Sequence, residues 1–158
     1  MALKKFKSFA SLKTQKFVYD ATVDGGTKNT SISIGTLPKN AMIVGGWAYV
    51  NTLPVGATTT LALGYTGATT AFSAATTAAN LAAGTYLRLT PGVINIGAGN
   101  AITTVDTPAE AVAYTRVSAD TFGAITLTAN KEVLVTLSND NDLTAGKLTV
   151  FIEYYLVA

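Results

Sequence analysis

Apolar and polar residues alternate with a period of two along most of this chain, and helical periodicity is scarce. In the segment 15–23, for example, Phe17, Tyr19 and Ala21 fall on one side. Such alternation indicates strands with one buried face. On this basis strands are predicted at 15–23, 29–37, 41–52, 58–66, 85–90, 111–118, 123–129, 132–139 and 147–158.

The last predicted strand shows the alternation most clearly. It opposes Val150, Ile152, Tyr154 and Leu156 to Thr149, Phe151, Glu153 and Tyr155. If the strand is regular, one ring of the Tyr154–Tyr155 pair has to point away from the core. The outward ring is a candidate interface side chain, and Tyr155 is assigned this role.

Gly, Pro and Asp residues mark the breaks between strands. The segment 24–29, DGGTKN, has the Asp-Gly chemistry of a hairpin turn. Gly45 and Gly46 stand inside a predicted strand and indicate a bulge or a close approach of another backbone. Trp47, which follows them among small residues, is predicted to lie in the core. Ala favours helix and Thr resists it, so an Ala- and Thr-rich stretch predicts a short helix or an irregular excursion near 72–82.

Eight or nine short strands with turn signals between them are typical of an all-β, antiparallel β-sandwich. The length of the chain and its long central excursion favour a jelly-roll-like sandwich over an immunoglobulin-like one. A chain of 158 residues corresponds to one domain. We therefore expect a basic N-terminal arm at 1–13 and a single β-sandwich domain at 14–158.

Charge is sparse and unevenly distributed along the chain. Only 13% of the residues are charged, whereas 49% are hydrophobic. Five of the eleven basic residues stand in the first sixteen positions, which leaves six basic and nine acidic residues, a net charge of −3, for the remainder. A body with so few charges is expected to hide surface in an assembly, because charge keeps monomers apart.

Few residues are equipped for catalysis. The chain has no His and no Cys, which excludes Ser-His-Asp and Cys-His mechanisms and Cys-ligated zinc within it. Asp140 and Asp142 form a D-x-D pattern without the Gly and Glu that an EF-hand loop requires, so an Asx-rich turn is expected. Asp106 and Glu110 are interpreted as solvated loop carboxylates. We expect no enzymatic activity and no catalytic residue, cofactor or metal.

The first sixteen residues, here called the leader, contain both Lys and Phe. This combination distinguishes four interpretations of the leader. Nucleic-acid-binding tails carry more charge, often with Arg. The apolar positions drift around a helix instead of forming one stripe, and the chain has no run of about 20 apolar residues, so neither contact with nucleic acid nor contact with a membrane is expected. A disordered terminus leaves the Phe residues unexplained. A partner-docking arm explains both residue types, and its candidate binding residues are Lys4, Lys5, Phe6, Lys7 and Phe9.

Three stretches resemble small structural proteins of tailed bacteriophages. They are LTANKEVLVTLSNDNDLTAGKLTVFIEYYLVA, with its LTAG turn and closing aromatic EY; LPKNAMIVGGWAYVNT; and TLALGYTGATTAFSAATTAANLAAGTY. Together they cover most of residues 32–158 in order. The family that they resemble is that of capsid decoration, cement or auxiliary head proteins.

The resemblance implies a β-sandwich or jelly-roll domain that assembles on a capsid, often as a trimer. We accordingly expect a decoration or cement protein on the capsid surface of the virion, assembled in the host cytoplasm. Its expected partners are the major capsid protein and further copies of itself, with a trimer favoured. Three alternatives stay open: a carbohydrate- or receptor-binding module of a tail or fibre, a hydrolase with carboxylates in a cleft, and a coat protein that builds a shell.

Overall fold

The computed structural model describes residues 11–56, 58–89, 105–106, 124–138 and 141–157. Within these residues the chain forms ten strands and one short 3₁₀ helix, η1, at Ala78–Asn80. The strands are β1 Lys13–Asp20, β2 Ser31–Leu37, β3 Ala41–Val55, β4 Thr60–Tyr65, β5 Ala68–Thr77, β6 Tyr86–Arg88, β7 Val105–Asp106, β8 Ile125–Thr126, β9 Lys131–Ser138 and β10 Ala145–Leu156.

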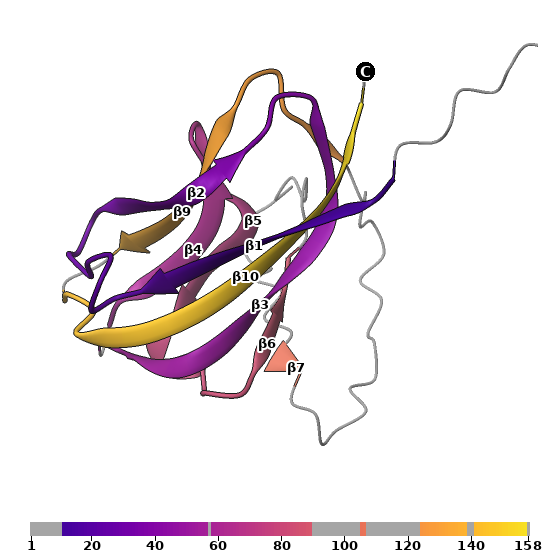
Figure 1. Ribbon diagram of the computed structural model, residues 1–158. Coiled ribbons are helices and arrows are strands. Elements are labelled where there is room, and N and C mark those ends of the chain that lie inside the picture. Colours follow the sequence, from indigo (N-terminus) through magenta and orange to yellow (C-terminus); the bar gives the residue numbers. More distant parts are fainter. Residues whose placement is uncertain (1–10, 57, 90–104, 107–123, 139–140, 158) are drawn as a thin grey trace, which may run out of the picture.

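The strands form two antiparallel sheets that pack face to face (Figure 1). The first sheet has the order β1-β10-β3-β6-β7, with β8 also paired to β3, and the second has the order β2-β9-β4-β5. In chain order the pairs β1–β10, β2–β9, β3–β6 and β4–β5 are nested inside one another. A long hairpin wound into two sheets in this way is a jelly roll, so the predicted fold class is confirmed.

The hydrophobic core fills the space between the sheets. Phe17 and Tyr19 point inward from β1, and Val150 and Ile152 point inward from β10, as the alternation predicts. They meet buried residues of the second sheet, among them Leu61, Leu63, Val133, Val135 and Leu137. Burying one such side chain stabilises the fold by roughly 1.5–3 kcal/mol.

The prediction that Trp47 lies in the core is wrong. Both Ile43 and Ala48 are fully buried, although two residues five apart on a regular strand face opposite sides. The register of β3 against β10 shifts beside Glu153, so one extra residue is accommodated there. This bulge, which the Gly45–Gly46 pair indicates, reverses the alternation and turns Trp47 to the outer face of the sheet.

The segment near 72–82, predicted to be a short helix or an irregular excursion, is strand in its first part and a short 3₁₀ helix near its end. β5 occupies Ala68–Thr77, and only Ala78–Asn80 forms a single 3₁₀ turn. Two tertiary contacts account for the strand: Phe72 is buried in the core, and its ring lies 5.7 Å from that of Tyr65 on β4. The Thr residues, which resist helix, fit a strand well, so packing decides against the helical preference of Ala.

The segment 24–29 is not a hairpin turn. β1 belongs to the first sheet and β2 to the second, so the chain between them crosses from one sheet to the other. The crossing segment is held by Leu143, whose backbone N–H donates to the carbonyl of Gly26 at 2.7 Å. Asp142 also accepts a hydrogen bond from the backbone N–H of Lys28 at 2.8 Å. The local Asp-Gly signal gives a turn, but it does not determine which strands the turn connects.

The first strand, β1, begins one residue before the expected boundary between arm and body. Lys13, assigned to the arm from the sequence, is already paired with Tyr154 of β10. Residues 1–10, which hold most of the predicted arm, lie outside the described residues, as does the predicted strand 111–118. The division into an arm and one domain stays a prediction.

Candidate interaction surface

The outer faces of the two sheets differ in chemistry. On the second sheet, small hydroxyl side chains predominate, and Ser31 Oγ lies 2.9 Å from Thr136 Oγ1 across β2 and β9. None of the large exposed apolar side chains of the described residues lies on a strand of this sheet. Val18, Val44 and Tyr86, by contrast, are on strands of the first sheet and are 39%, 41% and 42% exposed. An interaction surface is therefore sought on the first sheet.

One row of four side chains crosses this outer face. Lys16 of β1 is paired with Phe151 of β10, Phe151 with Trp47 of β3, and Trp47 with Arg88 of β6. The rings of Trp47 and Phe151 stack, with centroids 5.0 Å apart and 21° between their planes. Residues opposite each other on one face of a sheet are neighbours, so the row has an aromatic centre with a basic residue at either end.

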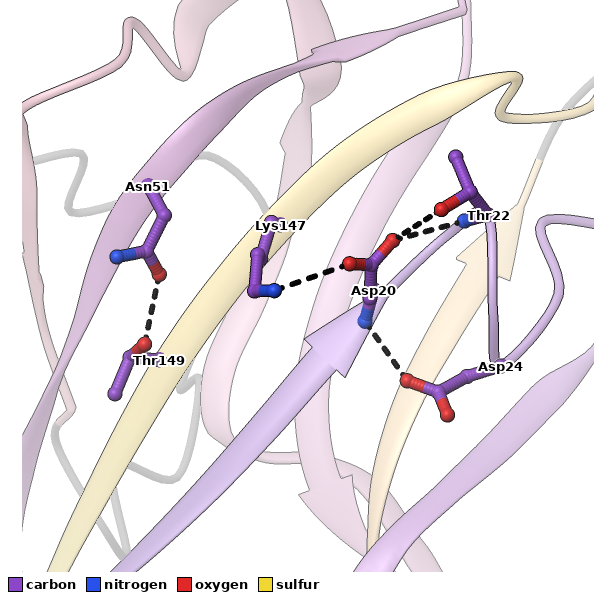
Figure 2. A network of polar contacts seen from close by, with 6 residues as sticks. All are labelled: Asp20, Thr22, Asp24, Asn51, Lys147 and Thr149. Atoms are coloured by element: carbon purple, nitrogen blue, oxygen red, sulfur yellow. Dashed lines mark hydrogen bonds and ion pairs between the residues drawn. The ribbon is translucent and has the colours of Figure 1, made fainter.

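A second row lies two residues away along the same four strands. It consists of Val18, Thr149, Tyr49 and Tyr86. The rings of Tyr49 and Tyr86 lie 4.9 Å apart at 48°. Thr149 donates a hydrogen bond to Asn51 Oδ1 at 2.7 Å, as Figure 2 shows. The two rows together place four aromatic rings side by side.

The sequence prediction for the last strand is confirmed in its orientation. Tyr154 is 7% exposed and belongs to the core, whereas Tyr155 is half-buried on the outer side, paired with Met42 of β3. The outward side chains Trp47, Tyr49, Tyr86, Phe151 and Tyr155 together form the aromatic face of the first sheet. That Tyr155 binds a partner stays a prediction, and Lys4, Lys5, Phe6, Lys7 and Phe9 lie outside the described residues.

Two opposite charges border the centre of the aromatic face. Lys16 is paired with Phe151. Glu153 is the next outward-facing residue of β10 after Phe151, and it is paired with Thr14. Neither Lys16 nor Glu153 forms an ion pair with another described residue. The carboxylate of Glu153 lies on the β3 side, where a Cβ built on Gly45 would be 3.5 Å from Oε2. Both charges therefore border the aromatic rings without neutralising each other.

A compact polar network closes one end of this sheet (Figure 2). Asp20, at the end of β1, pairs with Lys147 of β10 at 3.2 Å and accepts hydrogen bonds from the hydroxyl and backbone N–H of Thr22 at 2.7 and 3.1 Å. The hydroxyl of Thr22, followed by Lys147, lowers the pKa of Asp20. Asp24 accepts from the Asp20 backbone N–H at 2.8 Å. These contacts fix the turn that follows β1.

The carboxylates of the described part of the chain do not cluster as a metal site would require. No group of three or more Asp and Glu side chains there is placed to hold a metal ion. Asp142 serves instead as a hydrogen-bond acceptor for the crossing segment at Lys28. Asp140 and Glu110 and the side chain of Asp106 are not among the described parts. No helix in the described residues is long and apolar enough to span a membrane.

Comparison with known proteins gives likeness in structure only. No protein-family model and no curated protein matches the chain. A chain of the cyanophage Pam1 capsid asymmetric unit has a TM-score of 0.61 and 18% identity, and the match covers 99% of this chain and 93% of that one. A chain of the Ralstonia phage GP4 capsid has a TM-score of 0.53 and 20% identity, covering 99% and 92%. The fold is thus shared with chains of similar length over nearly their whole extent.

From the sequence, only one member of the aromatic face, Tyr155, is predicted to be an outward-pointing interface residue. The alternation puts Phe151 and Tyr155 on the same side of β10, but it assigns no role to Phe151, and it predicts that Trp47 lies in the core. The missing step was the effect of the bulge on side-chain alternation. Counting backward from the buried Val50 instead of forward from Ile43 would have assigned Trp47 and Tyr49 to the same outer face.

Proposed function

We propose that this chain is a non-enzymatic structural protein of a bacteriophage virion, acting as a decoration or cement protein of the head. The observation that carries the proposal is the aromatic face, centred on the stacked Trp47 and Phe151 rings. The shared fold with chains of two phage capsids supports it. A jelly roll with one polar and one aromatic outer face is suited to burying a surface against a neighbouring subunit.

Such a protein works through contact area and repetition. A standard interface buries about 1,600 Å² in total and needs no reactive group. Repetition of the same contact around a shell turns modest affinities into strong retention. Aromatic side chains supply much contact area for few rotatable bonds and are enriched at interfaces. This chain carries five of them on one outer face.

The proposal includes finer points that rest on the family resemblance. The partner is the major capsid protein, the site is the outer surface of the capsid, and assembly takes place in the host cytoplasm. The resemblance also implies a homo-oligomer of three copies. Attachment involves the leader, with lysines meeting acidic patches and Phe6 and Phe9 filling pockets on the capsid.

Rebinding to particles tests this proposal. Purified protein is added to particles assembled without it, and the bound copies are counted by quantitative mass spectrometry over a range of salt concentrations. The full chain should saturate a fixed number of sites. A chain lacking residues 1–10 keeps β1 intact, because β1 starts at Lys13. It should melt within a degree or two of the full chain yet be released faster. No saturable binding by the full chain would contradict the proposal.

A second function, binding of a carbohydrate or cell-surface receptor, is favoured by one observation: Trp47 faces outward beside Tyr49 and Tyr86. The ring geometry argues against sugar stacking. Two rings lying flat and side by side on a sheet would need centroids farther apart than the 5.0 Å found for Trp47 and Phe151, so these rings are stacked on each other. One face of each ring is therefore occupied by the other ring, which leaves less ring surface for a sugar.

Trp47 is the only tryptophan in the chain, so its fluorescence reports directly on this face. Under the structural proposal, titration with a panel of bacterial surface glycans should leave the emission unchanged. A saturable change in emission that Trp47→Phe abolishes would instead favour the carbohydrate-binding function. A Trp47→Phe protein that still changes its Tyr signal would point to a separate glycan site.

A further inference from the structure

We propose that the aromatic face is a contact between two copies of this chain, related by a two-fold axis lying between their faces. In this arrangement Lys16 of each copy meets Glu153 of the other, while the two Phe151 rings pack at the centre. The inference does not depend on a virion location, and it departs from the three-copy assembly that the family resemblance implies, because a two-fold contact pairs two copies. It names the occupant of a surface whose chemistry is already described.

The first argument is charge complementarity. Lys16 and Glu153 lie at diagonal positions on β1 and β10. Neither forms an ion pair with another described residue, although Asp20 and Lys147 on the same two strands pair at 3.2 Å. A surface that carries one positive and one negative group, both without an internal partner, is complementary to itself after a two-fold rotation, because the rotation exchanges the two positions.

The second argument is the position of the apolar groups relative to these charges. Phe151 lies directly opposite Lys16 and one outward position from Glu153. A two-fold axis that exchanges the two charges therefore passes beside Phe151 and brings the two Phe151 rings, with their Trp47 partners, into one cluster. Stable interfaces share this anatomy, in which an aromatic centre is surrounded by a polar rim.

The third argument is area. β1 has eight residues, which at about 3.3 Å per residue gives a length of roughly 26 Å, and four strands about 4.8 Å apart give a width of roughly 19 Å. The outer surface of these strands therefore has a footprint of at most about 500 Å² before the relief of the side chains is added, because β6 is only three residues long. Standard interfaces bury about 800 Å² per partner, so the contact is smaller than a standard interface and fits a weak dimer that dissociates on dilution.

Sedimentation velocity of the full chain, from sub-micromolar to high micromolar concentration, tests the contact. The wild-type protein should sediment as a dimer that dissociates on dilution, with a red shift of the Trp47 emission as the face becomes hydrated. Phe151→Thr should raise the dissociation constant about tenfold or more, which corresponds to about 1.4 kcal/mol per decade. Val23→Thr is the matched control, because it also replaces an apolar side chain by Thr, and Val23 is 78% exposed in the turn after β1, outside both rows.

Charge exchange identifies the orientation. Lys16→Glu alone and Glu153→Lys alone each put like charges against each other twice in the dimer, so each should weaken association about tenfold or more. The double variant restores opposite charges and should return the dissociation constant to within about threefold of wild type. Thermal melting of each variant in the dilute, monomeric range separates loss of fold from loss of contact.

Three results would overturn the inference: a wild-type monomer at every concentration, a trimer whose mass is unchanged by Phe151→Thr, and single charge variants that the double variant does not rescue. A monomer would indicate that another partner covers the face. A trimer would agree with the copy number implied by the resemblance and would place its contacts elsewhere. None of these three results affects the rebinding experiment, which tests the proposed function separately.

Discussion

Trp47 and Phe151 stack across β3 and β10 on the outer face of the first sheet, with ring centroids 5.0 Å apart. Their contact connects two strands that are distant in sequence and adjacent in register. Because both rings are on the outside, the pair forms the centre of the aromatic face, and we expect its stacking to stabilise the sheet as well. The two contributions are separable by experiment.

A double-mutant cycle measures the contribution to stability. Trp47→Ala, Phe151→Ala and the double variant are unfolded with urea at a concentration at which the protein is monomeric. Aromatic pairs of this geometry couple by about 0.5–1.5 kcal/mol beyond their buried area. A coupling energy indistinguishable from zero would show that the two rings stack without stabilising the monomer. The parallel cycle for Tyr49 and Tyr86, at 4.9 Å and 48°, should give a coupling of similar size.

Two adjacent glycines of β3 should respond very differently to a methyl group. At Gly46 the backbone φ is 153°, and a Cβ would lie 2.2 Å from the carbonyl oxygen of Phe151. At Gly45 the nearest atom to a Cβ is the flexible Glu153 carboxylate, at 3.5 Å. Gly46→Ala should therefore lose about 2 kcal/mol or more of unfolding free energy, and Gly45→Ala should lose much less. Equal losses of unfolding free energy at the two positions would show that the backbone of the bulge shifts to accommodate a methyl group at Gly46.

The pKa of Asp20 links the polar network to acid stability. Hydrogen bonds from Thr22, followed by Lys147, lower this pKa below its ordinary value near 3.8. A carboxyl whose pKa is lower in the folded than in the unfolded state contributes stability above its unfolded pKa. That stability is lost as the pH falls through the folded pKa. In melting curves recorded from pH 6 to pH 2, the wild-type protein should lose more stability than Asp20→Asn.

The two causes of the lowered pKa are also testable separately. Thr22→Val removes the hydroxyl that contributes the largest single part of the lowered pKa of Asp20, whereas Lys147→Gln removes the cation. Carboxyl titration by NMR should therefore show a rise in the Asp20 pKa for each variant. An Asp20 pKa that neither substitution changes would contradict the assignment of these contacts.

Tyr19 provides the corresponding alkaline signal. Burial, reinforced by Asp24 and Asp20, raises its pKa from 10.0 to about 12, and its hydroxyl donates to the Gly25 carbonyl at 2.9 Å. A raised pKa contributes stability that is complete below pH 10 and is lost between about pH 10 and 12, because the unfolded chain releases the proton first. Tyr19→Phe should remove this alkaline loss.

At neutral pH the same variant should be less stable by about 0.5–1.5 kcal/mol, since the Gly25 carbonyl loses a buried donor. Tyr86→Phe is the matched control: its ring is 42% exposed, and with Tyr19 intact the alkaline loss should remain. A Tyr19→Phe protein that melts in parallel with wild type from pH 9 to pH 12 would contradict the assignment.

The fold was predictable from the sequence wherever strand alternation is uninterrupted. On β10 the inward and outward sides were assigned correctly as far as Tyr155, because one unbroken period of two fixes every residue once the core side is known. At Trp47 the same reasoning failed, since a single inserted residue reverses the sides. The bulge was visible as Gly45–Gly46, but its effect on alternation was not applied.

Connections between strands were less predictable than the strands themselves. DGGTKN gives a turn, yet its partners are Leu143 and Asp142, more than one hundred residues further along the chain. Likewise the strand at 68–77 depends on burial of Phe72, which the local Ala and Thr content does not indicate. The aromatic face itself requires three strands that are distant in sequence, β3, β6 and β10, to be adjacent, so only the sheet order reveals it.

A cryo-EM reconstruction of particles produced by the genome that encodes this chain tests the central proposal most directly. The account predicts jelly-roll density for this chain on the outer capsid shell, with the Trp47 and Phe151 rings covered by a neighbouring subunit. Absence of the chain from the particle, or its presence with the aromatic face fully open to solvent, would contradict it.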